Sequence, residues 1–501
     1  MILADAIDTL RELVVTPPPA GTLDVRPLTA VAYDSRRVVP AALFVALKGL
    51  KADGAAFAEQ ALSRGAQAVV AETPAPTGVT VPWVVVRDAR LALALLADRF
   101  FDHPSRRMPV IGVTGTNGKT TTAYLLTAML DQAGLQAGML GTVAYRIGGE
   151  DREASRTTPE APDVQQLLSD MLRHGNRSAV MEVSSHALSL KRVDGMQFAA
   201  AVFSNLTRDH LDFHEDMEAY FAAKRRLFEM LPRDAPGVIN MDDPRGASLV
   251  EISGRPVTYA INAPADVRPG SVAMTLGGLT FDVTTPRGTV HIQSKLVGRP
   301  NVYNILAATA TAVSLDVPID AIERGVAGLA GVPGRFEVVS AAGDDVTAVV
   351  DYAHTDDALR NLLETARPLG ARRLVTVFGC GGDRDRSKRP LMGMVAARLS
   401  DVVVITSDNP RSEDPKRIIE EIERGIPAGS QSRTPTVVSV VDRAEAIDRA
   451  IAMAEGGDVV LIAGKGHEKY QQIGDRVLPF DDGEVARTAL AKRRQSGAKG
   501  S

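Results

Sequence analysis

The densest group of residues that could do chemistry lies at 115–121, where Gly-Thr-Asn-Gly-Lys-Thr-Thr follows an apolar run. Glycines let backbone N–H groups curl around phosphate oxygens, and the start of a helix adds partial positive charge. A lysine in such a loop reaches the terminal phosphates of a nucleotide, and the next threonine offers a hydroxyl to Mg²⁺. The segment therefore predicts a nucleotide-phosphate site. Its residues are Gly115, Thr116, Asn117, Gly118, Lys119, Thr120 and Thr121.

This loop departs from the strict pattern GxxxxGK[ST], because Val113 stands where the first glycine is expected. The alternative is a glycine-rich turn between a strand and a helix, with Lys119 in solvent. Strand, Gly-Lys-Thr and helix follow one another in the order that phosphate binding needs, which favours the phosphate site.

An acidic residue at the end of a neighbouring strand usually completes the metal site of such a loop. Glu182 ends the apolar run at 179–181 and is the residue that we expect to bind Mg²⁺. Asp209, His210 and Lys224 are less informative by spacing alone. Their ordinary structural roles are a helix-start carboxylate, a capped or core imidazole and a solvated ammonium.

Short β-branched runs alternate with helical segments and set the expected fold. Continuous apolar runs suit strands of a parallel sheet that is covered on both faces, which predicts the α/β class. We expect a central parallel sheet of the phosphate-loop ATPase type and a C-terminal, doubly wound, Rossmann-like domain. The segment 255–300 is instead typical of antiparallel hairpins. The runs lie at 83–86, 109–113, 178–183, 200–205, 346–351, 373–379, 401–407 and 458–464.

The length of 501 residues is about three times the ~150 residues of an average domain, which predicts three domains. Helix-breaking residues at 101–105 and 331–334 mark two boundaries. The predicted domains are therefore 1–105, 106–334 and 335–501.

Composition excludes several classes of protein. Lys plus Arg is 57 and Asp plus Glu is 61, a net charge of −4 that makes nucleic acid an improbable main partner. Residues 1–15 are typical of a short amphipathic helix rather than a secretory signal, and no apolar run is long enough to span a membrane. The single cysteine, Cys380, excludes an internal disulfide and a thiolate metal site. These features predict a cytoplasmic protein.

Polar residues also follow the predicted strands of the last third of the chain, at Asp351, 379–386, 407–411 and 464–468. The carboxyl ends of parallel strands share one edge of a sheet, which is where doubly wound sheets bind ligands. A dinucleotide fingerprint at 379–382 is the alternative, but the third glycine of GxGxxG is missing, so we expect no nicotinamide site.

Seven ordered segments resemble those of the Mur ligases, the ATP-dependent, amide-forming enzymes of peptidoglycan assembly, and the resemblance covers nearly the whole chain. Segments 381–386, 388–390 and 408–411 are most similar to members that add meso-diaminopimelate to UDP-N-acetylmuramoyl-L-alanyl-D-glutamate. The seven segments are 115–121, 182–186, 205–210, 301–304, 334–336, 351–354 and 464–468.

The resemblance implies a ligase of cell wall biogenesis, and thereby of cell shape and cell division. ATP would convert the γ-carboxylate of the D-glutamyl residue into an acyl phosphate, which the diaminopimelate amine attacks with loss of phosphate. Mg²⁺ is the implied cofactor and ATP the co-substrate. The implied partners are small molecules, namely UDP-N-acetylmuramoyl dipeptide, ATP and meso-diaminopimelate. We expect no nucleic acid, no membrane insertion and a monomer.

Residue roles follow from the same resemblance. Lys224 matches the family's carbamylated lysine, in which CO₂ turns an ammonium into a carbamate that holds a second Mg²⁺ together with His210. The implied catalytic residues are Lys119, Glu182, His210 and Lys224. The implied metal ligands are Thr120, Glu182, His210 and the carbamate of Lys224. Positions around adenine, ribose and phosphates match Asn301, Asn304, Arg335 and Asp351, and lie on both sides of a domain junction.

Recognition of the nucleotide sugar is implied for the N-terminal domain, although 33–36 and 43–52 alone would be a turn and a buried strand. Leu190 stands where the family usually has glutamine, which removes an amide from the sugar-phosphate contacts. Asp356 replaces a usual proline, which should alter only a helix start. The implied contacts of the UDP-sugar peptide are Tyr33, Ser35, Leu50, Lys51, Ala52, Thr157, Thr158, Ser184, Leu190 and Arg192.

For diaminopimelate, the resemblance implies that Arg411 pairs with a carboxylate, that Arg389 adds positive charge and that Glu468 receives the distal ammonium. On its own, Asn409-Pro410 would be an ordinary loop after a strand. The implied residues are Arg389, Asp408, Asn409, Pro410, Arg411, Gly464 and Glu468.

Three alternatives stay open. A lysine-adding ligase of the same family and, more remotely, a folylpolyglutamate synthase would share the phosphate loop. A nucleotide switch or motor with a C-terminal binding module belongs to a different class, but it would not explain the segment 408–411 or Glu468.

Overall fold

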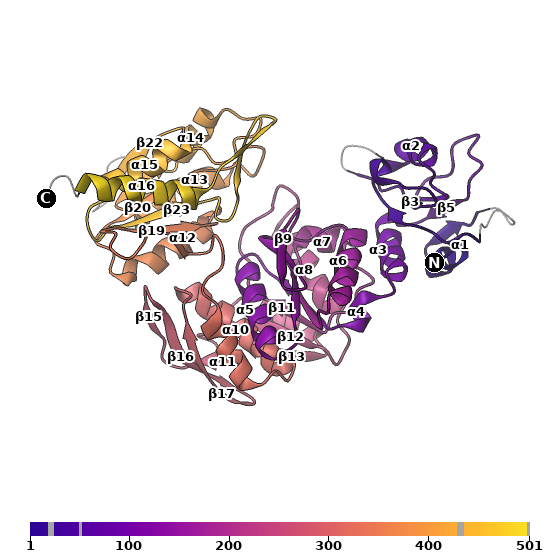
Figure 1. Cartoon of the computed structure of the whole chain (residues 1–501), viewed down its shortest axis with the longest axis horizontal. Helices are drawn as coiled ribbons and strands as arrows, with labels where there is room; N and C mark the ends of the chain where they lie inside the picture. Colours follow the sequence, from indigo (N-terminus) through magenta and orange to yellow (C-terminus); the bar gives the residue numbers. More distant parts are fainter. Residues whose placement is uncertain (19–24, 50–52, 428–434, 498–501) are drawn as a thin grey trace.

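The computed structural model describes residues 1–18, 25–49, 53–427 and 435–497. The chain forms three α/β lobes that follow one another along the sequence, and the first and third lobes rise from the middle one (Figure 1). The α/β class with a parallel central sheet and a doubly wound C-terminal sheet is confirmed.

The first lobe is a five-stranded sheet in the order β1-β5-β4-β3-β2. Its strands are β1 (Val14–Thr16), β2 (Val31–Ala32), β3 (Leu43–Val45), β4 (Ala68–Ala71) and β5 (Trp83–Val86). Its helices are α1 (Leu3–Thr9), α2 (Ala58–Ser63) and α3 (Ala89–Phe100), and α4 (Pro104–Arg107) leads to the next lobe. The prediction of one helix over 1–15 is wrong at its end, because Val14 and Thr16 form the edge strand β1, which pairs with β5.

The middle lobe is built on an eight-stranded sheet in the order β13-β12-β11-β6-β10-β7-β8-β9. Six strands are parallel, and β8 and β9 extend one edge in antiparallel fashion. The strands are β6 (Val110–Thr114), β7 (Ala137–Leu140), β8 (Ala144–Ile147), β9 (Glu150–Glu153), β10 (Ser178–Glu182), β11 (Ala200–Phe203), β12 (Pro236–Asn240) and β13 (Arg255–Tyr259).

Helices cover both faces of this sheet, as expected for apolar parallel strands. One core joins the sheet to α5 (Lys119–Gln132), α10 (Arg299–Ser314) and α11 (Ile319–Gly328). The core on the other face involves α6 (Ala161–Arg173), α7 (Ser185–Ser189), α8 (Met217–Glu229) and α9 (Gly246–Ile252).

The predicted antiparallel hairpins occupy a smaller segment than expected. They form a four-stranded sheet of β14 (Arg268–Pro269), β15 (Ala273–Thr275), β16 (Gly278–Thr285) and β17 (Gly288–Ser294). Residues 255–259 do not belong to it, because β13 pairs in parallel with β12. The long strand β16 alternates buried and exposed residues, which places its apolar face against the core of α10 and α11.

The third lobe is a six-stranded sheet in the order β18-β19-β23-β20-β21-β22, parallel except for β18. Its strands are β18 (Glu337–Val338), β19 (Thr347–Asp351), β20 (Leu374–Phe378), β21 (Val402–Ile405), β22 (Thr436–Ser439) and β23 (Val459–Ala463). Beyond them lies a separate hairpin of β24 (Tyr470–Ile473) and β25 (Arg476–Pro479).

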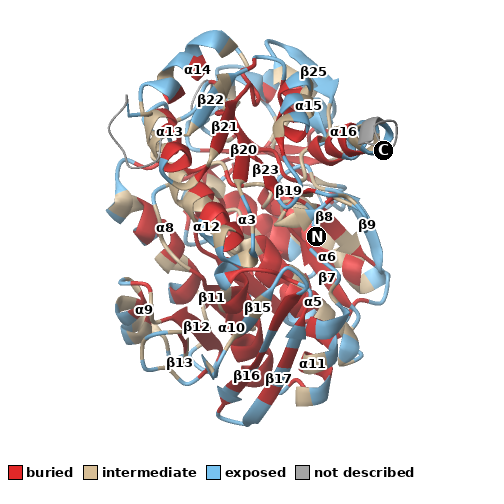
Figure 2. Cartoon of the chain, turned by 90° about the vertical axis from the view of Figure 1, so that its left-hand side faces the viewer, coloured by how far each residue is buried: buried red, intermediate tan, exposed pale blue. Residues whose placement is uncertain are grey.

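Helices again cover both faces of this sheet, and its strands are buried between them (Figure 2). One face packs against α12 (Asp356–Ala366), α13 (Lys388–Leu399) and α14 (Pro415–Glu423). The other packs against α15 (Arg443–Met453) and α16 (Asp482–Gly497). Asp356 is the first residue of α12, and the Thr355 hydroxyl caps this helix by accepting from Ala358 N.

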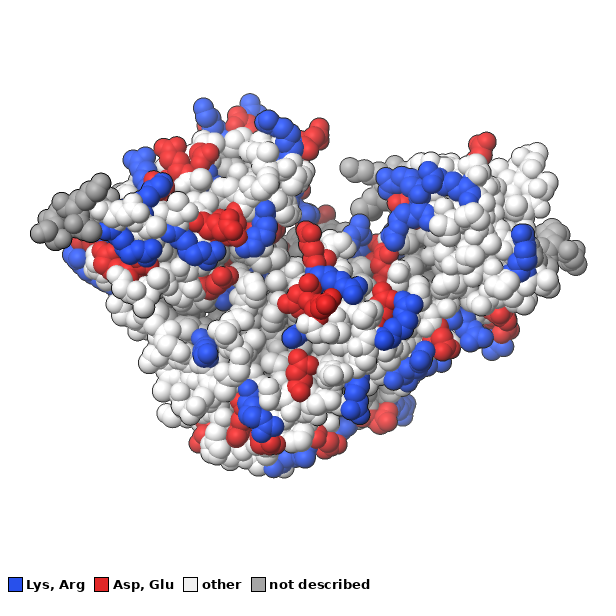
Figure 3. All heavy atoms as spheres, viewed as in Figure 1, with Lys and Arg blue, Asp and Glu red and all other residues white. Residues whose placement is uncertain are grey.

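Positive and negative side chains are interspersed over the face seen in Figure 3, which is hollowed between the first and third lobes. Within the described ranges, no helix is both long and apolar enough to cross a bilayer.

Candidate active site

The phosphate loop joins the end of β6 to the start of α5. Gly115 has a φ of 145° and Gly118 a φ of 88°, which a residue with a Cβ rarely adopts. A Cβ would also lie 1.9 Å from Ser204 Oγ at Gly115 and 2.3 Å from Asn304 Oδ1 at Gly118. Both glycines are therefore required by backbone conformation and by space.

Two lysines converge on this loop, Lys119, which is half-buried, and Lys224, which is buried. Lys119 Nζ donates to the carbonyls of Gly115 (2.9 Å) and Thr116 (2.8 Å), and Lys224 Nζ donates to the same Gly115 carbonyl (2.8 Å). Burial lowers the pKa of both amines, and the charge of Lys119 lowers the pKa of Lys224 further. The Lys224 side chain also lies over the Tyr220 ring, with Nζ 4.3 Å from the ring centroid. It is not the solvated charge that spacing alone allowed.

Glu182 ends β10, the strand next to β6, as its position in the sequence predicts. Its Oε2 accepts from Thr120 Oγ1 (3.1 Å) and from Thr142 Oγ1 (3.0 Å), and its Oε1 accepts from Thr142 N (2.8 Å). The carboxylate and the loop hydroxyl are therefore adjacent and buried.

These two groups fit Mg²⁺, which prefers oxygen ligands and usually keeps waters and phosphate oxygens beside one or two protein carboxylates. Among the described residues, no cluster of three or more His, Cys, Asp or Glu is arranged to hold a metal without such help. The site thus suits a cation that arrives with a nucleotide.

His210 lies in an aromatic cluster beside α8. Its ring centroid is 4.8 Å from that of His186 and 6.0 Å from that of Tyr220, and its φ is 56°. Burial lowers its pKa to about 3, so the imidazole is neutral and able to act as a metal ligand at neutral pH. Asp209 lies next to it, with an Oδ2 to His210 Nε2 separation of 3.5 Å. No helix begins at Asp209, because α8 starts only after its cap, Asp216.

The third lobe reaches the phosphate loop through two side chains. Arg335 Nη2 donates to Thr120 Oγ1 (3.3 Å), and Asp357 Oδ2 accepts from Asn117 Nδ2 (3.2 Å). The guanidinium of Arg335 stacks over the Tyr352 ring at 4.5 Å. These contacts bring residues that are more than 200 positions apart to one loop.

The other residues implied around the nucleotide are engaged within the protein. Asn304 Nδ2 donates to Asn301 Oδ1 (2.9 Å), and Asn301 Nδ2 donates to the Val297 carbonyl (2.7 Å). Asp351 accepts from the backbone N–H groups of Phe336 (2.7 Å) and Ala353 (2.8 Å), and burial raises its pKa. The structure places Asn304 against Gly118, whereas Asp351 shapes the turn that carries Arg335.

Residues implied for the sugar-peptide end gather beside Glu182. Thr158 Oγ1 donates to the Glu182 carbonyl (2.8 Å) and accepts from Ser184 N (3.1 Å), and Arg192 Nη1 donates to the Thr158 carbonyl (2.9 Å). Thr157 Oγ1 lies 3.0 Å from Thr142 Oγ1. Leu190 is the C-cap of α7.

Tyr33 and Ser35 belong to the first lobe. Tyr33 OH donates to Asp163 Oδ2 in the first turn of α6 (2.6 Å), and Ser35 Oγ bonds Gln60 Oε1 (2.6 Å). Burial and Asp163 raise the pKa of the Tyr33 phenol. Tyr33 thus connects the first lobe to the middle lobe. The implied contacts at 50–52 lie outside the described residues.

The polar strand ends of the third lobe meet at one edge, as the parallel order predicts. Asn409 Nδ2 donates to Glu468 Oε2 (2.9 Å), and Arg411 Nη1 donates to the Gly382 carbonyl (2.7 Å). Arg411 has a φ of 50°, a strained backbone conformation for a residue with a side chain. A Cβ at Gly464 would lie 2.7 Å from Asp408 Oδ2, and one at Gly382 would lie 1.9 Å from the Pro410 carbonyl.

Arg389, for which the resemblance implies a positive charge near diaminopimelate, is paired within the protein. Its side chain is completely buried, and its guanidinium donates to Glu413 at 2.8 and 2.9 Å and to Glu421 at 2.8 Å. It also donates to the Gly381 carbonyl (3.2 Å). The two glutamates therefore neutralise the charge of Arg389, and its bond to the Gly381 carbonyl stabilises the loop after β20.

Sequence reasoning missed two residues of this site. Thr142 bonds Glu182 through both its backbone and its hydroxyl; its signal was its place directly after a strand, beside the acidic strand end. Lys465 is fully buried under Asn409. It lies in the same segment as Gly464 and Glu468, which the resemblance implies as contacts of diaminopimelate.

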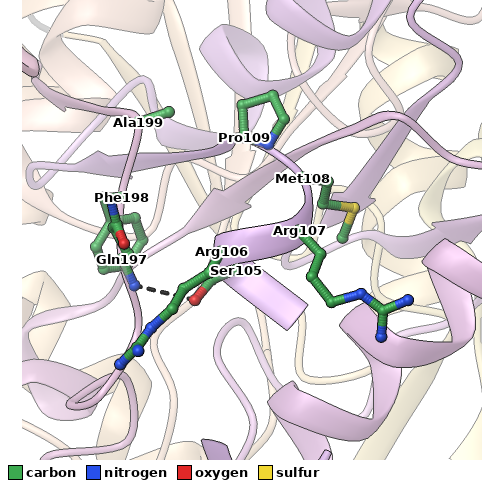
Figure 4. A pocket seen from close by; sticks show the side chains of 8 residues that line it. All are labelled: Ser105, Arg106, Arg107, Met108, Pro109, Gln197, Phe198 and Ala199. Carbon is green, nitrogen blue, oxygen red and sulfur yellow. Dashed lines mark hydrogen bonds between the residues drawn. The ribbon is translucent and has the colours of Figure 1, made fainter. Parts of the chain in front are cut away.

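A cavity of about 240 Å³ lies elsewhere, at the junction of α4 with the middle lobe (Figure 4). The residues that line it come just before β6 and β11 in the sequence. The cavity therefore lies at the amino ends of the parallel strands, opposite the edge that carries the candidate site. The dashed line in Figure 4 is the bond from Gln197 N to Ser105 Oγ, 3.0 Å. The lining residues are Ser105, Arg106, Arg107, Met108, Pro109, Gln197, Phe198 and Ala199.

Three family profiles match the chain in succession. Residues 27–101 match "Mur ligase family, catalytic domain", residues 113–312 match "Mur ligase middle domain" and residues 334–466 match "Mur ligase, glutamate ligase domain".

Curated relatives are similar over almost their whole length. A UDP-N-acetylmuramoyl-L-alanyl-D-glutamate–2,6-diaminopimelate ligase of Solibacter usitatus is 50% identical over 478 residues, which cover 94% of this chain and 95% of the relative. A relative of the same name from Geobacillus thermodenitrificans is 48% identical, with coverages of 93% and 96%.

Solved structures agree with this pattern. A UDP-N-acetylmuramoyl-L-alanyl-D-glutamate–2,6-diaminopimelate ligase superposes with a TM-score of 0.67 at 35% identity, covering 94% of this chain and 96% of that chain. The MurF ligase of Thermotoga maritima in complex with ADP shares the fold, with a TM-score of 0.63 at 19% identity and coverages of 93% and 98%. With half of its residues shared with such a relative over nearly its whole length, the chain belongs to the Mur ligase family.

Proposed function

We propose that this protein is an ATP-dependent ligase that joins meso-diaminopimelate to UDP-N-acetylmuramoyl-L-alanyl-D-glutamate during peptidoglycan synthesis. The observation that carries the proposal is the junction of the phosphate loop with the third lobe. Arg335 and Asp357 reach Thr120 and Asn117 there, so nucleotide and amino-acid residues can serve one reaction. The names of the relatives support the choice of substrates.

The proposed division of labour follows the three lobes. Residues 1–105 bind the uridine end, 106–334 bind ATP and the muramoyl dipeptide, and 335–501 bind diaminopimelate. Tyr33 and Arg192 support this order, because both reach the start of α6, through Asp163 and Glu160 respectively. A dipeptide held there would extend toward Glu182 and the phosphate loop.

In the proposed reaction, the substrate γ-carboxylate attacks the γ-phosphorus of ATP, ADP leaves, and an acyl phosphate forms. The diaminopimelate amine then attacks the acyl carbon, and the resulting tetrahedral intermediate expels phosphate. Two anions must meet in the first step, so the loop N–H groups and the ammonium of Lys119 have to offset their repulsion. Bound Mg²⁺, held by Thr120 and Glu182, would add positive charge at the phosphates.

Lys224 enters this proposal as a carbamate. A neutral amine adds to CO₂, and burial beside Lys119 lowers the pKa of Lys224, which favours the neutral form. An ammonium at this position would repel a cation, whereas a carbamate would attract it together with neutral His210. Because Nζ is buried in contact with the Gly115 carbonyl, the modified group would face the phosphate loop.

The first step can be tested by positional isotope exchange in ATP. Scrambling of ¹⁸O from the β,γ-bridge should require the UDP-sugar dipeptide and should occur before any amine is added. Exchange that begins only when diaminopimelate is present would contradict an acyl phosphate formed first. Hydrolysis of ATP that depends on neither substrate would instead favour a nucleotide switch.

A further inference from the structure

Lys465 is a buried lysine that the proposed reaction does not use. Its side chain is 0% exposed, and it lies beneath the loop at 408–411. Its Nζ is 2.9 Å from Asn409 Oδ1, 3.4 Å from Glu468 Oε2 and 3.9 Å from Asp408 Oδ1. A buried ammonium is costly unless it is paired and hydrogen-bonded, so these three partners account for its presence.

The partners of Lys465 are themselves fixed by the hairpin β24–β25. Asn409 Oδ1 accepts from Lys465 and from the backbone of Gln472, each at 2.9 Å, and Asn409 Nδ2 donates to Glu468. Gln471 Nε2 donates to the Asp408 carbonyl (2.7 Å). The side chain of Asn409 is therefore engaged by the protein on both its oxygen and its nitrogen.

Glu468 is held through one oxygen only. Asn409 and Lys465 both bond Oε2, and among the described residues none donates to Oε1. Lys465 carries +1 and Asp408 and Glu468 together carry −2, so the group has a net charge of 1 − 2 = −1. Arg443 does not change this balance, because it pairs with Asp482 in a fully buried ion pair. The group can therefore accept one more cation at Glu468 Oε1.

We infer that Lys465 is the positioning residue for the amino-acid substrate: it fixes Glu468 through Oε2 and thereby leaves Oε1 for the distal ammonium of that substrate. This inference rests on the proposed function. It differs from the role implied for Glu468, because it assigns the orientation of that carboxylate to a lysine that itself touches no substrate.

The test compares Lys465→Met with Lys469→Met. Lys469 is an exposed lysine four residues away that pairs with Asp481 at the surface. Loss of a charge-assisted bond to Glu468 should raise the KM for meso-diaminopimelate roughly 10- to 100-fold in Lys465→Met, whereas the KM values for ATP and the UDP-sugar dipeptide should stay within about twofold. Lys469→Met should behave as wild type.

A double-mutant cycle separates orientation of Glu468 from general damage. In a Glu468→Gln background, Lys465→Met should change the KM for diaminopimelate by less than about threefold, because its target is already gone. Independent effects that multiply would contradict the inference. Melting temperatures of all variants show whether each protein is folded.

The pH dependence provides a second readout. Burial and Asp408 raise the pKa of Glu468, and Lys465 opposes that rise; Tyr352, Tyr470 and Arg443 are the other ionisable groups around it. Without Lys465 the pKa of Glu468 should move upward, so the KM for diaminopimelate of Lys465→Met should fall as the pH is raised from 6 to 8. The wild-type KM should change less over this range.

The outcomes distinguish this inference from the proposed function. A wild-type protein that uses lysine instead of diaminopimelate would refute the proposed substrate, and the same variants would then be tested with lysine, which also has a distal ammonium. Equal rises of all three KM values in a folded Lys465→Met, or calorimetric binding of diaminopimelate as tight as in wild type, would overturn the inference alone.

Discussion

Lys224 is buried against the phosphate loop, unlike an ordinary solvated lysine, and its substitution tests the proposed carbamate. Lys224→Ala should lower kcat roughly 10²- to 10³-fold, because the variant loses the carbamate that would attract a cation to the transferring phosphoryl group. Formate or acetate should restore part of the rate by placing a carboxylate in the space. Steady-state ADP formation measures both effects.

The control for this prediction is Lys416→Ala, which removes an exposed lysine at the start of α14. It should retain wild-type activity. Full activity of Lys224→Ala without added acid would show that the side chain has no part in the reaction.

Leu190 offers a gain-of-function test. Leu190→Gln restores the amide that the family usually has, and one additional neutral hydrogen bond should lower the KM for the UDP-sugar dipeptide roughly 2- to 10-fold. The KM for ATP should not change. A higher KM for the dipeptide would mean that the first and middle lobes bind the sugar phosphates differently here.

For single residues, the sequence motifs predicted those contacts that follow directly from the residue types in the motif. The phosphate loop needs glycines, a lysine and a threonine in a fixed order, so the adjacency of Thr120 and Glu182 could be expected from the chain alone. The pairing of Arg389 could not be expected in this way. Its charge is neutralised by Glu413 and Glu421, which come from a later loop and helix. Thr142 was missed for the same reason, because its partner Glu182 ends another strand. Lys465 was missed because Asn409, which accepts from it, follows another strand.

The glycine loop between β6 and α5 leads to a prediction at the scale of elements. Gly118→Ala should reduce the activity at least tenfold and raise the KM for ATP, since a left-handed residue with a Cβ costs roughly 1–3 kcal/mol and the Cβ would collide with Asn304. The kinetic constants and the melting temperature measure the two contributions.

Gly134→Ala is the matched control. Gly134 has a φ of 75°, but a Cβ there meets no atom within 4 Å. It should lower the melting temperature by a similar backbone strain and leave the KM for ATP unchanged. A Gly118→Ala protein with normal ATP kinetics would contradict the role given to this loop.

Elements were predictable where burial alone determines them. All eight apolar runs form parallel strands, because strands covered on both faces need continuous apolar residues. The two errors concern edges: Val14–Thr16 is an edge strand after α1, and β13 extends the parallel sheet instead of joining the hairpins. The pairing of an edge strand depends on which other strand has an unpaired edge, and the residues of that other strand lie elsewhere in the chain.

At the scale of the whole molecule, we expect the contact between the middle and third lobes to contribute to nucleotide binding. Asp357→Ala removes the bond from Asn117 and should raise the KM for ATP severalfold, because the phosphate loop loses one of its two side-chain links to the third lobe. Asp356→Ala, one residue earlier in the same helix turn, is the control and should have little effect. Equal kinetics of the two variants would show that the contact does not contribute to nucleotide binding.

The central claim is the pairing of a UDP-sugar dipeptide with diaminopimelate in one ATP-consuming reaction. The most direct measurement is ADP formation by the wild-type protein with UDP-N-acetylmuramoyl-L-alanyl-D-glutamate and a panel of single amino acids. Lysine has a distal ammonium, which would pair with Glu468, but it lacks the second carboxylate of diaminopimelate, which would pair with Arg411. We therefore expect meso-diaminopimelate to be used far better than lysine. Omission of either the dipeptide or the amino acid should abolish steady ADP release. Equal use of lysine and diaminopimelate, or ADP release that needs neither substrate, would contradict the account.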